Sequence, residues 1–312
     1  MRVLVTGGAG FIGGTLTHAL VAAGADVTVV DDLSTGTSAN LHPAAELVAL
    51  DIMSPELARV VAQASPEAVV HLAAQVSVAA SVADPAFDRL INVDGTRLVA
   101  GAAVAAGARR MLFASSAAVY GDPVELPLTE QSCTTPTVPY GDSKLAAETV
   151  LREVLAPAGV DFAALRLANV YGPRQRTDGE GGVVAQFASR MVAGTPPVIF
   201  GSGAQTRDFI FVGDVVSAFV RALEHEGPLA LPGPAGAAYN ISTGRSTSVT
   251  DLADGLREAT GYTGPIERAG AREGDVAVSV LDPAKAEREL GWRATADLRS
   301  GLARTAASFA RT

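Results

Sequence analysis

Three polar side chains of this sequence have types and spacing suited to moving a proton and a hydride together. Tyr140 and Lys144 are four residues apart in an expected helix, so they share one face of it. A tyrosine hydroxyl, with an unperturbed pKa of about 10, becomes a better base when a lysine charge lowers that pKa. Ser116 follows the apolar run 110–114 and is placed to bind the same substrate oxygen. Together they suit oxidation of an alcohol beside a nicotinamide, although the tyrosine–lysine pair alone also fits an ordinary surface helix.

A glycine-rich turn near the N-terminus is the second feature with chemical meaning. The apolar run 3–5 predicts a short buried strand, and Gly7, Gly10 and Gly13 follow it before a helical pattern begins. Glycines let the backbone approach a pyrophosphate, and the first N–H groups of a helix point at it. The spacing therefore fits a dinucleotide-binding turn. A tight strand-to-helix turn without a ligand is the alternative.

Acidic residues follow the next two expected strands. Asp31 stands about 20 residues beyond the glycines, where a carboxylate accepts hydrogen bonds from an adenosine ribose. Asp32 lies next to it, and two carboxylates would repel a 2′-phosphate, so the pair favours NAD over NADP. The alternative, that the pair only begins a turn, is stronger for Asp32. Asp51, after the third strand, is placed to reach the adenine amino group.

Two polar residues lie in apolar surroundings further along the chain. We interpret His71, inside the expected strand 68–72, as a packed, hydrogen-bonded histidine rather than a catalytic one. The small residues Ala73 and Ala74 follow that strand and leave room for a flat cofactor. Asn92 lies in an expected helix over residues 84–106 and should have a specific hydrogen-bond partner.

These residues need a scaffold, and the alternation of short apolar strands with helices up to residue 167 predicts one. It indicates an α/β fold of the Rossmann type, with a doubly wound parallel sheet. Beyond residue 169 glycine, proline and arginine become frequent, which predicts a smaller, loop-rich α+β domain. We expect one helix with Ser54 as its N-cap and Pro55 in its first turn, and another over residues 215–223 with Asp214 as its cap. The last helices are expected at residues 248–260, 283–290 and 298–309.

The net charge, the apolar runs and the cysteine count of the chain exclude several classes of function. The chain has 312 residues and a net charge of -9, which argues against a nucleic-acid or anionic-membrane partner. No apolar run reaches the length of a membrane span, and the first residues enter a strand without a signal peptide. The single Cys133 excludes an internal disulfide and a cysteine metal site. We therefore expect a cytoplasmic protein with no bound metal.

Motifs along nearly the whole chain resemble the extended short-chain dehydrogenase/reductase family. The chain is most similar to its nucleotide-sugar branch and, within that branch, to the UDP-glucose 4-epimerases. The matching segments are TGGAGFIG (6–13), VVDDLSTG (29–36), VVHLAAQ (69–75), SSAAVYG (115–121), PYGDSKLAAE (139–148), LRLANVYGPRQ (165–175), TRDFIFVGDVV (206–216) and REGDVAVSVLD (272–282).

The resemblance implies a set of binding residues. It implies an NAD-binding domain over residues 1–168 and a nucleotide-sugar-binding domain over 169–312, with 206–225 and 239–243 packing back on the first. The catalytic residues are Ser116, Tyr140 and Lys144. The NAD-binding residues are Gly7, Gly10, Phe11, Ile12, Gly13, Asp31, Asp32, Asp51, Ile52, Leu72, Ala73, Ala74, Asn92, Tyr140, Lys144 and Val170. The substrate-binding residues are Gln75, Ser116, Asn169, Val198, Phe200, Arg207, Arg272, Asp275 and Ser279.

The resemblance implies a UDP-sugar 4-epimerase in which Tyr140 is the base and NAD is recycled. Related 4,6-dehydratases and decarboxylases carry acidic residues where this chain has Ala117 and Ala118, which favours simple epimerisation. A 4-reductase and a non-catalytic NAD-sensing protein are the further alternatives. The small Ser279 suggests that N-acetylated sugars are accepted as well. A UDP-glucuronate 4-epimerase also stays open, because arginines lie in the 172–177 loop.

The same resemblance predicts how copies of the chain associate. It implies a homodimer that forms through the helices near residues 84–106 and 139–157. The small-molecule partner is a UDP-sugar, and neither a nucleic acid nor a membrane is expected as a partner.

Overall fold

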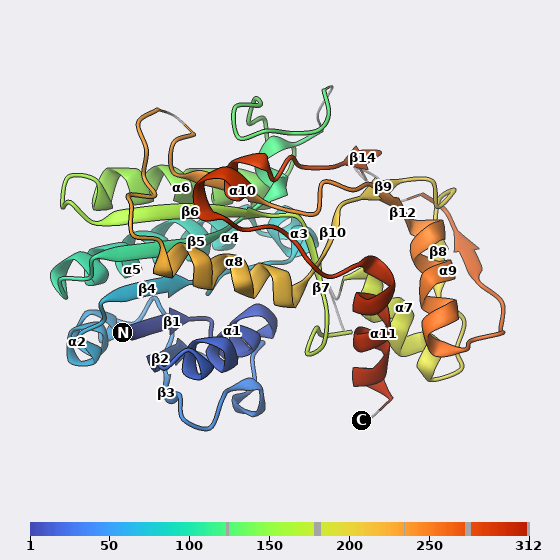
Figure 1. Ribbon diagram of the computed structural model, residues 1–312, viewed down its shortest axis with the longest axis horizontal. Helices are drawn as coiled ribbons and strands as arrows, with labels where there is room; N and C mark the ends of the chain where they lie inside the picture. The colour runs from blue at the N-terminus through green and yellow to red at the C-terminus, as the bar shows by residue number, and fades with distance from the viewer. Residues whose placement is uncertain (123–124, 178–181, 234, 272–275, 311–312) are drawn as a thin grey trace.

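A parallel sheet of seven strands forms the centre of the fold (Figure 1). The computed structural model describes residues 1–122, 125–177, 182–233, 235–271 and 276–310. The strand order is β11-β6-β5-β4-β1-β2-β3, and every neighbouring pair is parallel. The strands are β1 (Arg2–Thr6), β2 (Asp26–Asp31), β3 (Glu46–Ala49), β4 (Ala68–His71), β5 (Arg110–Ser116), β6 (Asp161–Leu167) and β11 (Ala238–Ile241).

Helices cover both faces of this sheet because its strands are apolar on both sides. In β1, Val3 and Val5 pack with Leu16 and Leu20, whereas Leu4 belongs to the opposite core. The predicted doubly wound α/β fold is thereby confirmed. The first face carries α1 (Phe11–Ala22) and α8 (Val212–Glu224), and the second carries α2 (Leu57–Ala64), α5 (Gly95–Ala105) and α6 (Pro139–Leu155).

A smaller region lies beside the carboxyl side of the sheet and is built mainly from the chain after β6 (Figure 1). Its helices α7, α9 and α11 pack against one another. Three small sheets join them, with the orders β10-β7, β12-β9-β14 and β13-β8. The elements are β7 (Asn169–Tyr171), α7 (Val183–Val192), β8 (Val198–Phe200), β9 (Thr206–Arg207), β10 (Phe209–Phe211), β12 (Thr247–Ser248), α9 (Val249–Thr260), β13 (Glu267–Ala269), β14 (Val278–Ser279) and α11 (Leu298–Phe309).

Three segments of the later chain return to the large sheet. Helix α8 packs against α1, and β11 pairs with β6 as the edge strand. Helix α10 (Ala284–Leu290) packs against β11 and α8. The boundary at residue 168 stays a prediction. None of the helices in the described ranges is long and apolar enough to span a membrane.

The helix expected over residues 84–106 is interrupted. The segment consists of α4 (Pro85–Arg89), a π-helical turn η2 (Leu90–Asp94) and α5, preceded by α3 (Val78–Ala83). Asp84 caps α4 by accepting a hydrogen bond from Phe87 N at 3.0 Å. Such π turns often mark functional sites, and this one carries Asn92.

Two predicted helix starts are wrong. Helix α2 begins at Leu57, because Ser54 Oγ instead accepts from Glu56 N at 3.2 Å in a preceding turn. Helix α8 begins at Val212, so Asp214 lies inside its first turn. The Asp214 carboxylate accepts hydrogen bonds from the segment before α11, including Thr295 N at 3.0 Å. A capping pattern in the sequence does not reveal such a distant partner.

Candidate active site

Steric limits define the turn between β1 and α1. Gly7 has a φ of 69°, and a Cβ there would lie 2.5 Å from the backbone nitrogen of Ala73. A Cβ on Gly13 would lie 2.2 Å from the Gly7 carbonyl oxygen. Gly10 is the N-cap of α1 and provides no side-chain cap to the first turn, which begins with Phe11 and Ile12. The turn therefore presents an uncapped helix N-terminus, which suits a pyrophosphate.

The two aspartates after β2 have different surroundings. Asp31 is buried, and its carboxylate accepts hydrogen bonds from Ala9 N and Leu33 N, both at 2.8 Å. It thereby fixes the glycine turn, and its lone pairs also suit ribose hydroxyls. Asp32 is exposed and accepts hydrogen bonds from the backbone and hydroxyl of Ser34. This arrangement supports Asp31 more strongly than Asp32 as a cofactor residue.

The other predicted NAD-binding residues surround this turn or follow neighbouring strands. Ile52 is buried, whereas Asp51 is exposed and accepts a hydrogen bond from Met53 N at 2.8 Å. Asn92 is buried, as its apolar neighbours predicted, and makes side-chain hydrogen bonds. The remaining predicted NAD-binding residues are partly buried. Leu72, Ala73 and Ala74 directly follow β4, and Val170 lies on β7.

Ser116, Tyr140 and Lys144 come together at the carboxyl end of β5. Ser116 is the last residue of that strand, and the other two occupy the first turns of α6. Lys144 is 3% exposed, and its Nζ donates a hydrogen bond to the Ala114 carbonyl at 3.0 Å. Its Nζ lies 5.8 Å from the centroid of the Tyr140 ring. The Ser116 side chain lies close enough to the Tyr140 hydroxyl to lower the tyrosine pKa by hydrogen bonding.

The protonation of this pair differs from the sequence-based expectation. Burial raises the pKa of Tyr140 to about 12, and the hydrogen bond with Ser116 offsets only part of that effect. Burial also lowers the pKa of Lys144 to about 8. The expected net lowering of the tyrosine pKa is therefore wrong, because desolvation dominates. The sequence contains the spacing of the pair but not the depth at which it is buried.

The candidate substrate residues lie on small strands of the second region. Arg207 on β9 is in register with Ser279 on β14, so the two are neighbours. Asn169 N donates a hydrogen bond to the carbonyl of Asp208, which follows Arg207. The Phe200 carbonyl on β8 accepts a hydrogen bond from Gln205 at 2.9 Å.

Val198, another candidate substrate residue, is partly buried on β8. The remaining three candidates are Gln75, Arg272 and Asp275. The Gln75 side-chain amide is engaged internally, because its Nε2 donates to Ser77 O at 2.9 Å and to Asp88 Oδ1 at 2.7 Å. Arg272 and Asp275 lie outside the described residues.

Comparison with known proteins identifies the family. The family model described as the NAD-dependent epimerase/dehydratase family matches residues 3–242. The chain belongs to that family. A UDP-glucose 4-epimerase of Mycolicibacterium smegmatis is 43% identical over 99% of this chain and 98% of its own length. UDP-glucuronic acid decarboxylase 1 of Arabidopsis thaliana is 32% identical over 99% of this chain and 70% of its own length.

Solved structures of this epimerase/dehydratase family share the whole fold. The crystal structure of a Thermotoga maritima UDP-glucose 4-epimerase with UDP-glucose has a TM-score of 0.94 and 39% identity, covering 100% of this chain and 99% of that one. A Thermus thermophilus UDP-glucose 4-epimerase in complex with NAD has a TM-score of 0.90 and 36% identity, covering 99% of both chains.

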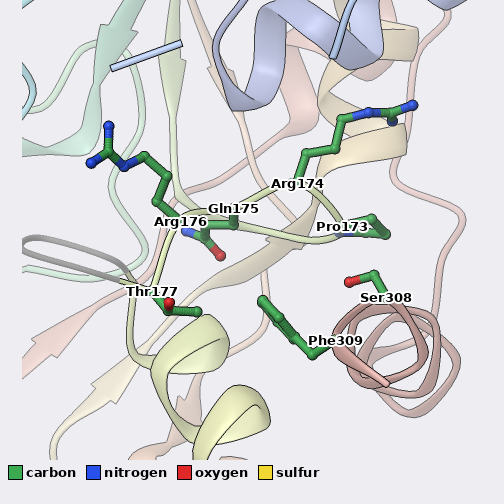
Figure 2. A pocket seen from close by; sticks show the side chains of 7 residues that line it. All are labelled: Pro173, Arg174, Gln175, Arg176, Thr177, Ser308 and Phe309. Carbon is green, nitrogen blue, oxygen red and sulfur yellow. The ribbon is translucent and has the colours of Figure 1, made fainter. Parts of the chain in front are cut away.

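A cavity of about 590 Å³ lies apart from the predicted site residues, between the loop after β7 and helix α11 (Figure 2). Arg174 and Arg176 point in different directions from this loop (Figure 2). Arg176 Nη1 donates to the Thr35 carbonyl at 2.9 Å, so the loop contacts the segment after β2. Arg174 lies close enough to His18 for its charge to lower the histidine pKa, after the larger effect of burial.

A buried ionic network behind Ser116 was missed in the sequence. Glu148 on α6 accepts hydrogen bonds from Ser115 Oγ at 2.6 Å and from Arg166 Nε and Nη2 at 2.9 and 2.7 Å. Arg166 Nη1 also donates to the Tyr120 hydroxyl at 3.0 Å. The signal was present, because Glu148 lies four residues after Lys144 on the same helix face.

Proposed function

We propose that the protein is a UDP-sugar 4-epimerase that uses NAD, with Tyr140 as its catalytic base. One observation carries this function. Tyr140 and Ser116 meet at the end of β5, where the Ser116 side chain acts to lower the tyrosine pKa, and the buried Lys144 lies one helical turn away. Full-length relatives named UDP-glucose 4-epimerase support it.

The residues present fit NAD. The uncapped N-terminus of α1 suits its pyrophosphate, and the space beside Gly10 stays free of a side chain. The Asp31 carboxylate suits an adenosine ribose and opposes a 2′-phosphate. When bound, NAD supplies the acceptor and then the donor of the hydride at C4 of the sugar.

The chain's own residues would move the proton and hold the sugar. Tyr140 takes the proton of the 4-hydroxyl while the hydrogen at C4 leaves as hydride, and Ser116 hydrogen-bonds the same oxygen. The 4-keto sugar then turns while Arg207 retains its diphosphate. Tyr140 returns the proton after hydride has been added to the opposite face. Arg272 and Asp275 are proposed to assist at the diphosphate and the nucleoside.

Two small residues support epimerisation over elimination. Ala117 and Ala118 begin the 3₁₀ turn η3 (Ala117–Tyr120), directly after Ser116. A 4,6-dehydratase needs an acid and a base near the sugar to remove water, and alanine side chains carry no transferable proton. The related dehydratases and decarboxylases therefore remain secondary candidates.

The function is tested with purified protein and no added cofactor. We expect denaturation to release NAD, and NMR to show UDP-glucose converted to its C4 epimer. The Tyr140→Phe variant should retain NAD but lose at least about a hundredfold in kcat, since it lacks the proton-transfer group. Ser116→Ala, which keeps the base, should lose less. Near-normal turnover by Tyr140→Phe would refute the assigned base, and loss of water or carbon dioxide would identify a different reaction.

Substrate choice is proposed to depend on Ser279, the register neighbour of Arg207. Its small, partly buried side chain leaves space for an N-acetyl group on the sugar. Ser279→Tyr should lower kcat/KM for UDP-N-acetylglucosamine by about tenfold or more, with a smaller effect on UDP-glucose. The Ser279→Ala control should keep both activities. Equal losses with both sugars in Ser279→Tyr would contradict this specificity role.

We further propose a homodimer and a cytoplasmic location. Exposed apolar side chains gather on the segment α3 to α5, namely Val82, Phe87, Leu90 and Leu98. Burial of such a patch against a second copy with two-fold symmetry would remove apolar area from water. The proposed substrate and cofactor are metabolites of the cytoplasm.

A further inference from the structure

The carboxylate of Asp88 is the strongest feature near the catalytic residues that the proposed mechanism does not use. Asp88 belongs to α4 and is 1% exposed. Its Oδ1 accepts hydrogen bonds from Gln75 Nε2 at 2.7 Å and Asn92 Nδ2 at 3.2 Å. Its Oδ2 is buried and has no hydrogen-bond partner among the described residues. A buried carboxylate with an unsatisfied oxygen is costly unless a positive charge compensates it.

Asn92 connects this carboxylate to the catalytic helix. Besides contacting Asp88, Asn92 Nδ2 lies 3.1 Å from Ser143 Oγ, within hydrogen-bonding distance. Ser143 directly precedes Lys144, and its hydroxyl donates to the Tyr140 carbonyl at 3.0 Å. Asp88 is therefore tied through one amide to the turn of α6 that carries the catalytic pair.

Lys144 is a buried cation on which the charge of Asp88 acts. The hydrogen bond of its ammonium group goes to a neutral carbonyl, that of Ala114, and its Nζ lies 4.8 Å from the centroid of the Phe113 ring. Asp88 acts on Lys144 through its charge and opposes the burial that lowers the lysine pKa. The same negative charge contributes to the raised pKa of Tyr140, after the larger effect of burial.

The other titratable groups around Lys144 either carry no charge or are paired with another residue. His71 on β4 is neutral, because burial and, to a smaller extent, the Lys144 charge lower its pKa to about 3. It is hydrogen-bonded on both ring nitrogens, to the hydroxyls of Thr6 and Thr96. Glu148 on α6 is paired with Arg166 of β6 at 2.7 Å. Asp88 is thus the carboxylate that remains to balance Lys144 within the described part of the chain.

We propose that Asp88 is a positioning residue of the active site, whose carboxylate holds the Gln75 and Asn92 amides and keeps Lys144 an ammonium ion. The catalytic meaning of that ammonium rests on the proposed function, whereas its protonation does not. Asp88 touches neither of the catalytic side chains through a hydrogen bond in the described structure. It acts through Asn92 and through its charge.

The lysine content of the chain makes a direct test possible. Lys144 and Lys285 are the only lysines of the sequence. Isotope-labelled lysine therefore gives two side-chain NMR signals, which Lys285→Arg assigns. Lys285 donates to three backbone carbonyls near β11 and serves as the internal control. In Asp88→Asn, which keeps the shape and an acceptor oxygen, we expect the Lys144 titration midpoint to move to lower pH while that of Lys285 stays.

Turnover adds a second readout in the same holoenzyme. Asp88→Asn should move both limbs of the kcat–pH profile to lower pH, because the carboxylate holds both Tyr140 and Lys144 toward their protonated forms. The matched control is Asp94→Asn, an exposed residue of the adjoining π turn, which should change neither readout. An unchanged Lys144 midpoint in Asp88→Asn would overturn the proposal. A shifted midpoint in a protein without epimerase activity would leave it standing and refute the proposed function instead.

A stability measurement answers the same question if Asp88→Asn does not fold. Lys144→Met leaves the Asp88 carboxylate without its cation, so the melting temperature should fall. Adding Asp88→Asn to Lys144→Met should then raise it. A further fall in the double variant would show that the two charges are not coupled and would overturn the proposal.

Discussion

At the scale of single residues, burial controls the chemistry more than sequence neighbours do. The Tyr140 hydroxyl has a pKa raised to about 12 although a lysine follows four residues later. A positively charged nicotinamide beside it would act in the opposite direction. The base would therefore be activated on cofactor binding rather than in the free chain. Asp31 also depends on its position, since its buried carboxylate holds the glycine turn through Ala9 N, which places it for the proposed contact with a ribose.

Removing the Asp31 carboxylate should weaken NAD binding and relax discrimination against NADP. Asp31→Ala deletes a charged acceptor of Ala9 N and the repulsion of a 2′-phosphate. We expect the Kd for NAD to rise by about tenfold to a hundredfold, from the loss of charged hydrogen bonds. Calorimetric titration of protein freed of cofactor measures both nucleotides. Asp32→Ala is the control, and an equal loss in both variants would contradict the assignment to Asp31.

At the scale of elements, α6 is the support of the site. Its one face carries Tyr140, Lys144 and Glu148, and the last of these joins α6 to β6 through Arg166. The π turn η2 then brings Asn92 to the same face, with Nδ2 3.1 Å from Ser143 Oγ. The proposed catalytic pair of Tyr140 and Lys144 is thus held on a helix that side chains distant in sequence fix from both sides.

Breaking the pair between α6 and β6 should destabilise the fold strongly. Glu148→Gln leaves the Arg166 guanidinium, which is 3% exposed, without its counter-charge. We expect the free energy of unfolding in urea to fall by about 3–5 kcal/mol. The control Glu56→Gln breaks the exposed pair with Arg59 on α2 and should cost about 1 kcal/mol or less. Similar losses in the two variants would refute the structural role of the buried pair.

At the scale of the whole molecule, exposed apolar area is concentrated away from the loop-rich region. Leu90 and Leu98 are 43% and 45% exposed on the segment that packs beside α6. An ion pair between Arg97 and Glu153 connects α5 and α6 on the same side. Helix α6, which carries the proposed catalytic residues, therefore borders the proposed dimer interface.

A charge placed in that patch should produce monomers. Leu98→Asp would bury a carboxylate against the second copy, at a cost that exceeds the apolar gain. Light scattering coupled to gel filtration should show half the mass of the unmodified protein. Val192→Asp, at a similarly exposed position on α7, should leave the mass unchanged. A monomeric unmodified protein would refute the proposed dimer at once.

The sequence by itself determined the parts that depend on local pattern. Short apolar strands alternating with helices predicted the doubly wound sheet, although not that β11 of the later chain completes it. The glycine spacing gave the shape of the β1–α1 turn, since Gly7 and Gly13 leave no room for a Cβ. The interval between Tyr140 and Lys144 placed both on one face of α6.

Only the tertiary structure decided the protonation of the site residues and the hydrogen-bond partners that hold them. The Asp214 carboxylate bonds to a segment about 80 residues away, and the Gln75 amide turns inward to Asp88. The Tyr140 hydroxyl has its pKa raised by burial and by the charge of Asp88, which lies about 50 residues earlier in the chain. Burial and long-range pairing depend on which elements pack together, and sequence spacing records only neighbours along one helix or strand. The same reason explains why the Asp88 carboxylate emerged from the structure, although Asp88 lies four residues before Asn92 in the sequence.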